Sequence, residues 1–61
     1  MTNASEVVVQ WPVEIALYYE RNQRTWWAFY RNAETGDQLT PAWFGPSRDQ
    51  VLVHRPNTPR V

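Results

Sequence analysis

Apolar residues recur at every second position along the first third of the chain. From Val7 to Tyr19 every odd-numbered residue is apolar, whereas the even-numbered positions mix polar and apolar types. A period of two is typical of a strand, since a helix would scatter these side chains around its axis. The pattern predicts a strand over residues 13–19, with residues 7–11 as a looser extension of it. Pro12 has no N–H for a sheet ladder, so it indicates an edge, a bulge or a break between two shorter strands.

The second predicted strand, residues 25–31, is apolar on both faces. Alternation would send Trp27 and Phe29 to one face and Trp26, Ala28 and Tyr30 to the other. A strand without a polar face is usually central in its sheet, or has a second apolar surface to cover. We therefore expect this strand to lie in the middle of the sheet.

Polar segments of hairpin length flank that strand, at residues 21–24 and 32–37. Gly36 can take a positive φ in the second of these loops, and Asn and Asp side chains favour turns. Residues 38–44 form the third predicted strand, which Pro41 places at an edge. The three strands would then form an antiparallel meander.

The segment from residue 47 to residue 54 fits two structures. Ser47 and Gln50 have the spacing of a capping box, which predicts a short helix. The run Val51 to Val53 also suits a fourth strand, because β-branched residues weaken a helix slightly. The expected fold is a small β or α+β domain, with a three-stranded antiparallel meander and a short C-terminal helix or fourth strand. We expect a single domain with flexible tails at residues 1–6 and 56–61.

The size of the chain changes how the two apolar faces are interpreted. A domain of 61 residues buries only about 60% of the surface that its unfolded chain exposes. There is no Cys to form a disulfide, but nine aromatic residues, four of them Trp, can supply a core. Such a short chain can hardly cover both faces of a sheet. The second face would be covered by the chain's own C-terminal segment, by a second copy or by a different molecule.

Charge and composition argue against several classes of function. The formal net charge is zero, with six Arg, no Lys and six acidic residues, whereas an obligate duplex-DNA binder is usually more basic. His54 is the only His and the acids are scattered, so we expect no enzyme, no metal, no cofactor and no small-molecule substrate. No apolar run approaches the roughly 20 residues that a membrane helix needs, and the N-terminus lacks the features of a secretory signal. We expect a cytoplasmic protein without a membrane partner.

Three hypotheses for function follow from the surplus of aromatic residues. The leading one is a non-enzymatic protein-interaction module, such as an adaptor, a regulator or a phage-type inhibitor. The second is a nucleic-acid-binding sheet domain, in which Arg residues flank aromatic ones. The third is a self-associating protein that pairs through the edge of residues 7–9. The predicted partner-binding residues are Trp26, Tyr30, Trp43, Tyr18 and Arg31, and the predicted nucleic-acid contacts are Arg21, Arg24 and Arg31.

Three resemblances all imply a three-stranded antiparallel sheet. Residues 29–32, then Thr35, then residues 43–46 resemble the second half of a WW domain, which implies that Phe29 or Tyr30 forms a groove with Trp43 for a proline-rich ligand. Residues 11–15 and 43–46 are similar to segments of small cyanobacterial proteins of unknown function. The Thr-Gly hairpin and the Phe-Gly turn before a helix resemble AP2-type and integrase arm-binding DNA domains.

Overall fold

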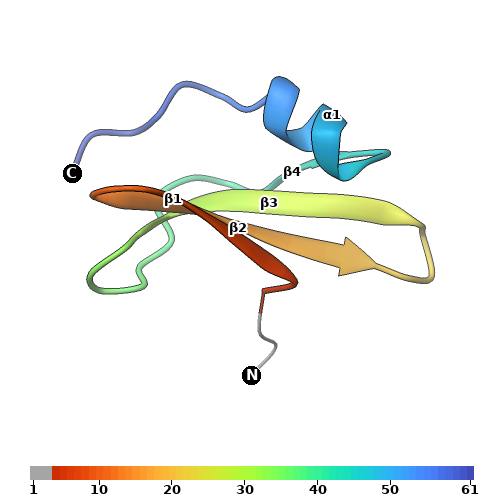
Figure 1. The fold of residues 1–61 in the computed structure, drawn as a ribbon, viewed down its shortest axis with the longest axis horizontal. Helices are drawn as coiled ribbons and strands as arrows, with labels where there is room; N and C mark the ends of the chain where they lie inside the picture. The colour runs from red at the N-terminus through yellow and green to blue at the C-terminus, as the bar shows by residue number, and fades with distance from the viewer. Residues whose placement is uncertain (1–3) are drawn as a thin grey trace.

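A computed structural model describes residues 4–61, which form a four-stranded antiparallel sheet and a short helix (Figure 1). The elements are β1 (Glu6–Gln10), β2 (Val13–Glu20), β3 (Thr25–Asn32), β4 (Trp43–Gly45) and α1 (Arg48–Val53). The strands lie in the sheet in chain order, so each pairs with its neighbour in sequence. The predicted class, a small antiparallel meander with a short C-terminal helix, is confirmed, and the fourth strand lies at the N-terminal end.

The first hairpin differs from the prediction. Residues 7–11 do not extend β2; the chain reverses at residues 11–12, and β1 pairs antiparallel with β2 so that Val8 lies opposite Ile15. Because of this reversal, even-numbered residues of β1 lie on the same side of the sheet as odd-numbered residues of β2. Val8 packs towards the core with Ile15, whereas Val7 and Val9 point to the other side of the sheet. Pro12 therefore marks a break between two strands, one of the alternatives that its missing N–H allowed.

The third predicted strand is shorter than expected and lies later in the chain. β3 is an interior strand, as predicted, and pairs with β2 along its whole length. On its other side, residues 38–42 contribute only an isolated bridge from Gln38 to Arg31 before β4 begins. Pro41 has no N–H to donate, and the side-chain oxygen of Thr40 accepts the hydrogen bond of the Tyr30 N–H at 3.2 Å. A side chain thus replaces part of the regular ladder.

The core lies between the sheet and α1. The helix and the segment that follows it run over one side of the sheet (Figure 1). The Tyr30 hydroxyl donates a hydrogen bond to the Pro56 carbonyl at 2.8 Å, and Trp43 Nε1 donates to the Val51 carbonyl at 3.0 Å. The polar ends of these two aromatic side chains are therefore satisfied. We call this side the helix-covered face, with Val8, Val13, Ile15, Leu17, Trp26, Ala28, Tyr30 and Trp43.

Two local features place α1 on the sheet. The Ser47 side-chain oxygen accepts a hydrogen bond from the Gln50 N–H at 3.2 Å, so the predicted N-cap is confirmed. Gly45 lets the helix approach closely, because a Cβ at this position would lie 3.0 Å from a methyl carbon of Val51. Ser47 thus sets the start of α1, and the missing side chain of Gly45 lets Val51 pack closely on β4.

The predicted tails have different outcomes. Residues 1–3 lie outside the described part of the chain. The Ser5 N–H donates to the Leu17 carbonyl at 2.7 Å and Glu6 begins β1, so the predicted tail over residues 1–6 does not extend to Glu6. Residues 55–61 form no helix or strand, and Pro56 is held by the Tyr30 hydroxyl. The flexibility of residues 56–61 stays a prediction.

A surface ion pair joins α1 to the edge strand β1. The single Nε–H of Arg48 is shared between the two Glu6 carboxylate oxygens, at 2.8 and 2.7 Å, and Arg48 Nη2 donates a further hydrogen bond to the same carboxylate. These bonds from Arg48 hold the pKa of Glu6 below its ordinary value. A carboxylate with a lowered pKa stabilises the fold above its unfolded-state pKa, and that contribution is lost as the pH falls through the folded-state pKa.

We therefore expect the coupling between Glu6 and Arg48 to depend on pH. A double-mutant cycle with Glu6→Gln, Arg48→Gln and the double variant, measured by urea unfolding, should show a favourable coupling near pH 7. The coupling should diminish below about pH 4, as the carboxylate is protonated. Raising the salt concentration should also weaken it, because both side chains are partly exposed. A coupling that is the same at pH 7 and pH 3 would contradict this assignment.

Candidate functional site

The side of the sheet opposite α1 carries an apolar surface that crosses all four strands. Strand register places its members on the face that points away from the core. Phe44 and Val9 are 67% and 61% exposed, and the aromatic side chains of β2 and β3 between them are partly exposed. We call this surface the open face; its exposed or partly exposed apolar residues are Val7, Val9, Tyr18, Trp27, Phe29 and Phe44, and Ala16 lies on the same side but is 0% exposed.

The aromatic rings of the open face form two separate pairs. Tyr18 stacks on Phe29, with ring centroids 5.5 Å apart and planes at 21°. Trp27 packs against Phe44, with centroids 5.0 Å apart. Tyr18 and Trp27 lie directly opposite each other in the β2–β3 register, but each ring takes a different partner. Ring pairs of this geometry stabilise the positions of the side chains that form them.

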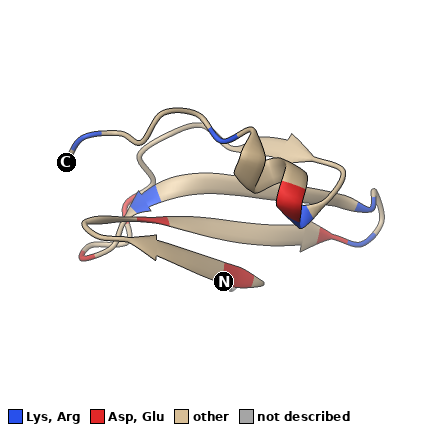
Figure 2. Cartoon of the chain, turned by 45° about the horizontal axis from the view of Figure 1, so that its top comes forward, with Lys and Arg blue, Asp and Glu red and all other residues tan. Residues whose placement is uncertain are grey.

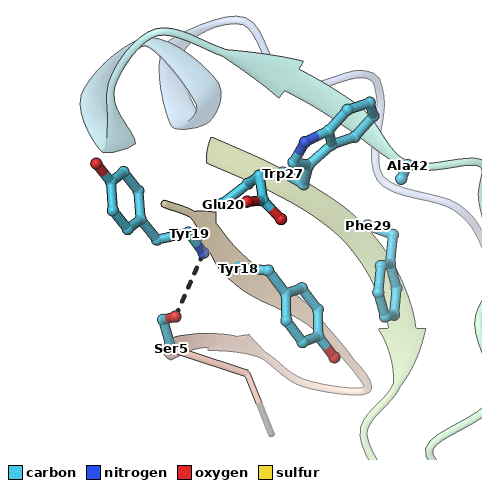
Figure 3. Close-up of a pocket in the computed structure, with 7 residues that line it drawn as sticks. All are labelled: Ser5, Tyr18, Tyr19, Glu20, Trp27, Phe29 and Ala42. Carbon is cyan, nitrogen blue, oxygen red and sulfur yellow. Dashed lines mark hydrogen bonds between the residues drawn. The ribbon is translucent and has the colours of Figure 1, made fainter. Parts of the chain in front are cut away.

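A hollow of about 370 Å³ opens between the two aromatic pairs. Tyr18, Trp27 and Phe29 border it, together with Glu20 from the end of β2 and Ala42 from the segment before β4 (Figure 3). In Figure 3 the carboxylate of Glu20 lies between the rings of Tyr18 and Trp27. The lining is thus mostly apolar, with an acidic group at one end.

Charged groups lie at both ends of the open face. Glu14 and Arg31 are opposite each other in the β2–β3 register and form an ion pair, and their side chains are only 15% and 25% exposed. At the other end, Glu20 Oε1 accepts a hydrogen bond from the Asn22 N–H at 2.8 Å. The open face therefore has an apolar centre between polar ends, the arrangement expected of a protein interface.

The structure divides the predicted partner-binding residues between the two faces. Tyr18 and Arg31 lie on the open face, as a contact surface requires. Trp26, Tyr30 and Trp43 lie on the helix-covered face, and Tyr30 is 0% exposed, so their prediction as one exposed surface with Tyr18 is wrong. The physical reason is that Val51 of α1 packs over this side of β3 and not over the side of Trp27.

Sequence reasoning missed most of the open face. Trp27 and Phe44 were not among the predicted contacts, residues 7–9 were predicted only as an edge for self-association, and Phe29 appeared only through the WW resemblance. Gly45 is a signal that could have identified them, because a glycine beside a helix favours close packing on its own face and leaves Phe44 on the other. The hairpin at Pro12 is a second signal, since a two-residue turn inverts the parity of β1 relative to β2.

The groove implied by the WW resemblance is not formed. Phe29 and Trp43 lie on opposite faces of the sheet. Tyr30 and Trp43 do pack together, with ring centroids 5.3 Å apart, but Tyr30 is wholly buried within the core. An aromatic pair in that position contributes to folding and offers no exposed groove to a proline-rich segment.

The three arginines predicted to contact nucleic acid do not form one surface. Arg21 and Arg24 lie in the turn between β2 and β3, whereas Arg31 lies near the far end of β3 and pairs with Glu14. Blue segments in Figure 2 mark both ends of β3. Arg31 follows Thr25 by six positions along the strand, or roughly 20 Å at 3.3 Å per residue. The arrangement lacks the continuous basic groove that single-strand binding favours.

Comparison with protein-family models, with curated proteins and with solved structures found no match. Within residues 4–61, no helix combines the length and the apolar character needed to cross a membrane. The same described residues contain no group of three or more His, Asp or Glu side chains arranged to hold a metal ion.

Proposed function

We propose that this chain is a non-enzymatic protein-interaction module, which binds another protein through its open face. The observation that carries the proposal is the exposed apolar surface across four strands, opposite a face that is already closed by a helix. Exposed surfaces rich in aromatic residues are typical of binding sites, and Trp and Tyr are enriched among the residues that dominate binding energy.

Two features of the open face support this proposal. The paired rings and the partly buried Glu14–Arg31 ion pair offer a partner a surface with little conformational freedom left to lose.

Self-association is a second candidate, because β1 lies at the edge of the sheet and carries exposed Val9. Val8 is unsuitable for testing it, since Val8 packs against the core. Sedimentation of the parent chain and of Val9→Lys distinguishes the two candidates. If the parent chain is a dimer that the substitution dissociates, the partner is a second copy. If the parent chain is a monomer, the partner is a different protein.

We expect charge on the open face to abolish partner binding without unfolding the domain. Phe44→Glu and Val9→Glu place carboxylates on the open face at positions that are largely exposed, so each should cost about 1 kcal/mol of stability or less. Val53→Glu is the matched control, because Val53 is equally exposed on α1. Proteins retained by the parent chain from source-cell extract are compared with those retained by the three variants, and candidates are then purified and titrated.

Support requires a purified protein that binds the parent chain and Val53→Glu with similar Kd, and that binds Phe44→Glu at least tenfold more weakly. A purified partner that binds all four chains equally would show that the contact surface does not include the open face. If no protein depends on the open face and the chain stays monomeric, the proposal fails.

A further inference from the structure

We infer that the hollow on the open face holds an arginine side chain of the partner protein. The inference rests on the proposed function and adds the chemistry of the partner to it. The observation is the combination of π faces and a carboxylate around one opening: Tyr18, Trp27 and Phe29 border the hollow, and Glu20 lies at one end.

The aromatic arrangement gives the hollow its shape. Tyr18 packs on Phe29 and Trp27 packs on Phe44, so the rings of Tyr18 and Trp27, at opposite positions of β2 and β3, do not pack on each other, and the hollow opens beside them. A planar cation can enter that space and lie against the ring faces. Cations are attracted to the negative faces of aromatic rings, most strongly to Trp.

Glu20 is the charged residue of the lining and makes the hollow acidic. Glu20 Oε1 already accepts the Asn22 N–H, which holds the carboxylate at the end of the hollow while the other oxygen can accept further bonds. An apolar side chain in the hollow would desolvate this carboxylate without compensation, and an acidic one would be repelled. A cationic side chain satisfies both the carboxylate and the rings.

Arginine suits this site better than lysine. Its guanidinium is planar, stacks on aromatic rings and is more weakly hydrated than the compact ammonium of lysine, and it can donate two parallel hydrogen bonds to a carboxylate. The chain's own arginines do not fill the site. None of the lining residues is Arg, and the ion pairs within residues 4–61 join Arg31 to Glu14 and Arg48 to Glu6 and Asp49.

The test is a titration of the ¹⁵N-labelled full chain with short peptides, followed in ¹H–¹⁵N spectra. The probes are acetyl-Ala-Arg-Ala-amide and the same peptide with citrulline, lysine or leucine in place of arginine. Citrulline keeps the planar shape of arginine and removes the charge. We expect a saturable shift of the Trp27 indole N–H with the arginine peptide, and a Kd at least about threefold weaker for each of the other three.

Two pairs of variants locate the effect. Glu20→Gln keeps the size of the side chain and should weaken binding of the arginine peptide about threefold, whereas Glu34→Gln, in the exposed loop after β3, should leave it unchanged. Phe29→Leu should weaken it about threefold, whereas Trp11→Leu, at the exposed β1–β2 turn, should not. Spectral dispersion shows whether each variant remains folded.

Several outcomes would overturn the inference. Equal binding of the citrulline peptide would exclude recognition of charge, and equal binding of the lysine peptide would exclude the choice of arginine. Binding of the arginine peptide without a shift at Trp27, or without any effect of Glu20→Gln, would place it elsewhere. If a purified partner depends on Phe44 while the arginine peptide does not bind, the inference about the hollow fails and the proposed function stands.

Discussion

Replacing Tyr30 with alanine is expected to remove about 3–5 kcal/mol of the free energy of unfolding, a large part of the total. The ring is wholly buried and packs on Trp43, and the hydroxyl donates to the Pro56 carbonyl. Removing a buried aromatic side chain costs about 3–5 kcal/mol, whereas a domain of this size is expected to have only about 3–9 kcal/mol in total. The measurement is urea unfolding followed by far-ultraviolet circular dichroism.

Tyr19→Ala is the matched control, because the Tyr19 ring is 43% exposed and packs against Trp26 at the margin of the core. Its cost should be about 1 kcal/mol. Tyr30→Phe should lie between the two variants, because it keeps the ring and loses only one hydrogen bond, worth about 1 kcal/mol, while leaving the Pro56 carbonyl unpaired. A Tyr30→Ala variant as stable as Tyr19→Ala would show that the ring does not lie in the core.

Replacing Gly45 with valine is expected to push α1 away from the sheet. Even a Cβ at this position would lie 3.0 Å from a methyl carbon of Val51 and 3.4 Å from its backbone nitrogen. Backbone cannot move aside as a flexible side chain can, so we expect a loss of about 2–3 kcal/mol, with Gly45→Ala less affected. Urea unfolding measures the loss.

The control for Gly45→Val is Phe44→Val, one position away on the opposite face. Phe44 is largely exposed, so this substitution should cost less than about 1 kcal/mol. The fluorescence of Trp43 should also change in Gly45→Val, since its indole N–H bonds to the Val51 carbonyl. If both valine variants unfold at the same urea concentration, the helix does not rely on close approach at Gly45.

Local signals in the sequence were sufficient for most of the fold. The run from Thr25 to Asn32 forms an interior strand, because its β-branched and aromatic residues suit a sheet that is apolar on both faces. Ser47 and Gln50 form the expected cap, because an N-cap depends on residues close in sequence. These features needed no knowledge of tertiary contacts.

The orientation of the faces could not be predicted from the same signals. The alternation from Val7 to Tyr19 looks like one long strand, and only the reversal at residues 11–12 shows that Val7 and Ile15 face opposite sides. Which face of β3 receives the helix depends on where Val51 packs, a contact between distant parts of the chain. Both aromatic faces of β3 looked equivalent without that contact, so Tyr30 was assigned to the surface and Trp27 was not.

The opposite faces of β2 and β3 give this fold a property useful in a scaffold. Tyr30 and its neighbours in the core occupy alternate positions along the same strands that carry Trp27 and Phe29 outward. Changes at the outward positions can therefore alter what the surface recognises while the residues that specify the fold remain constant. A library randomised at Val9, Trp27 and Phe44 would sample new specificities on an unchanged core.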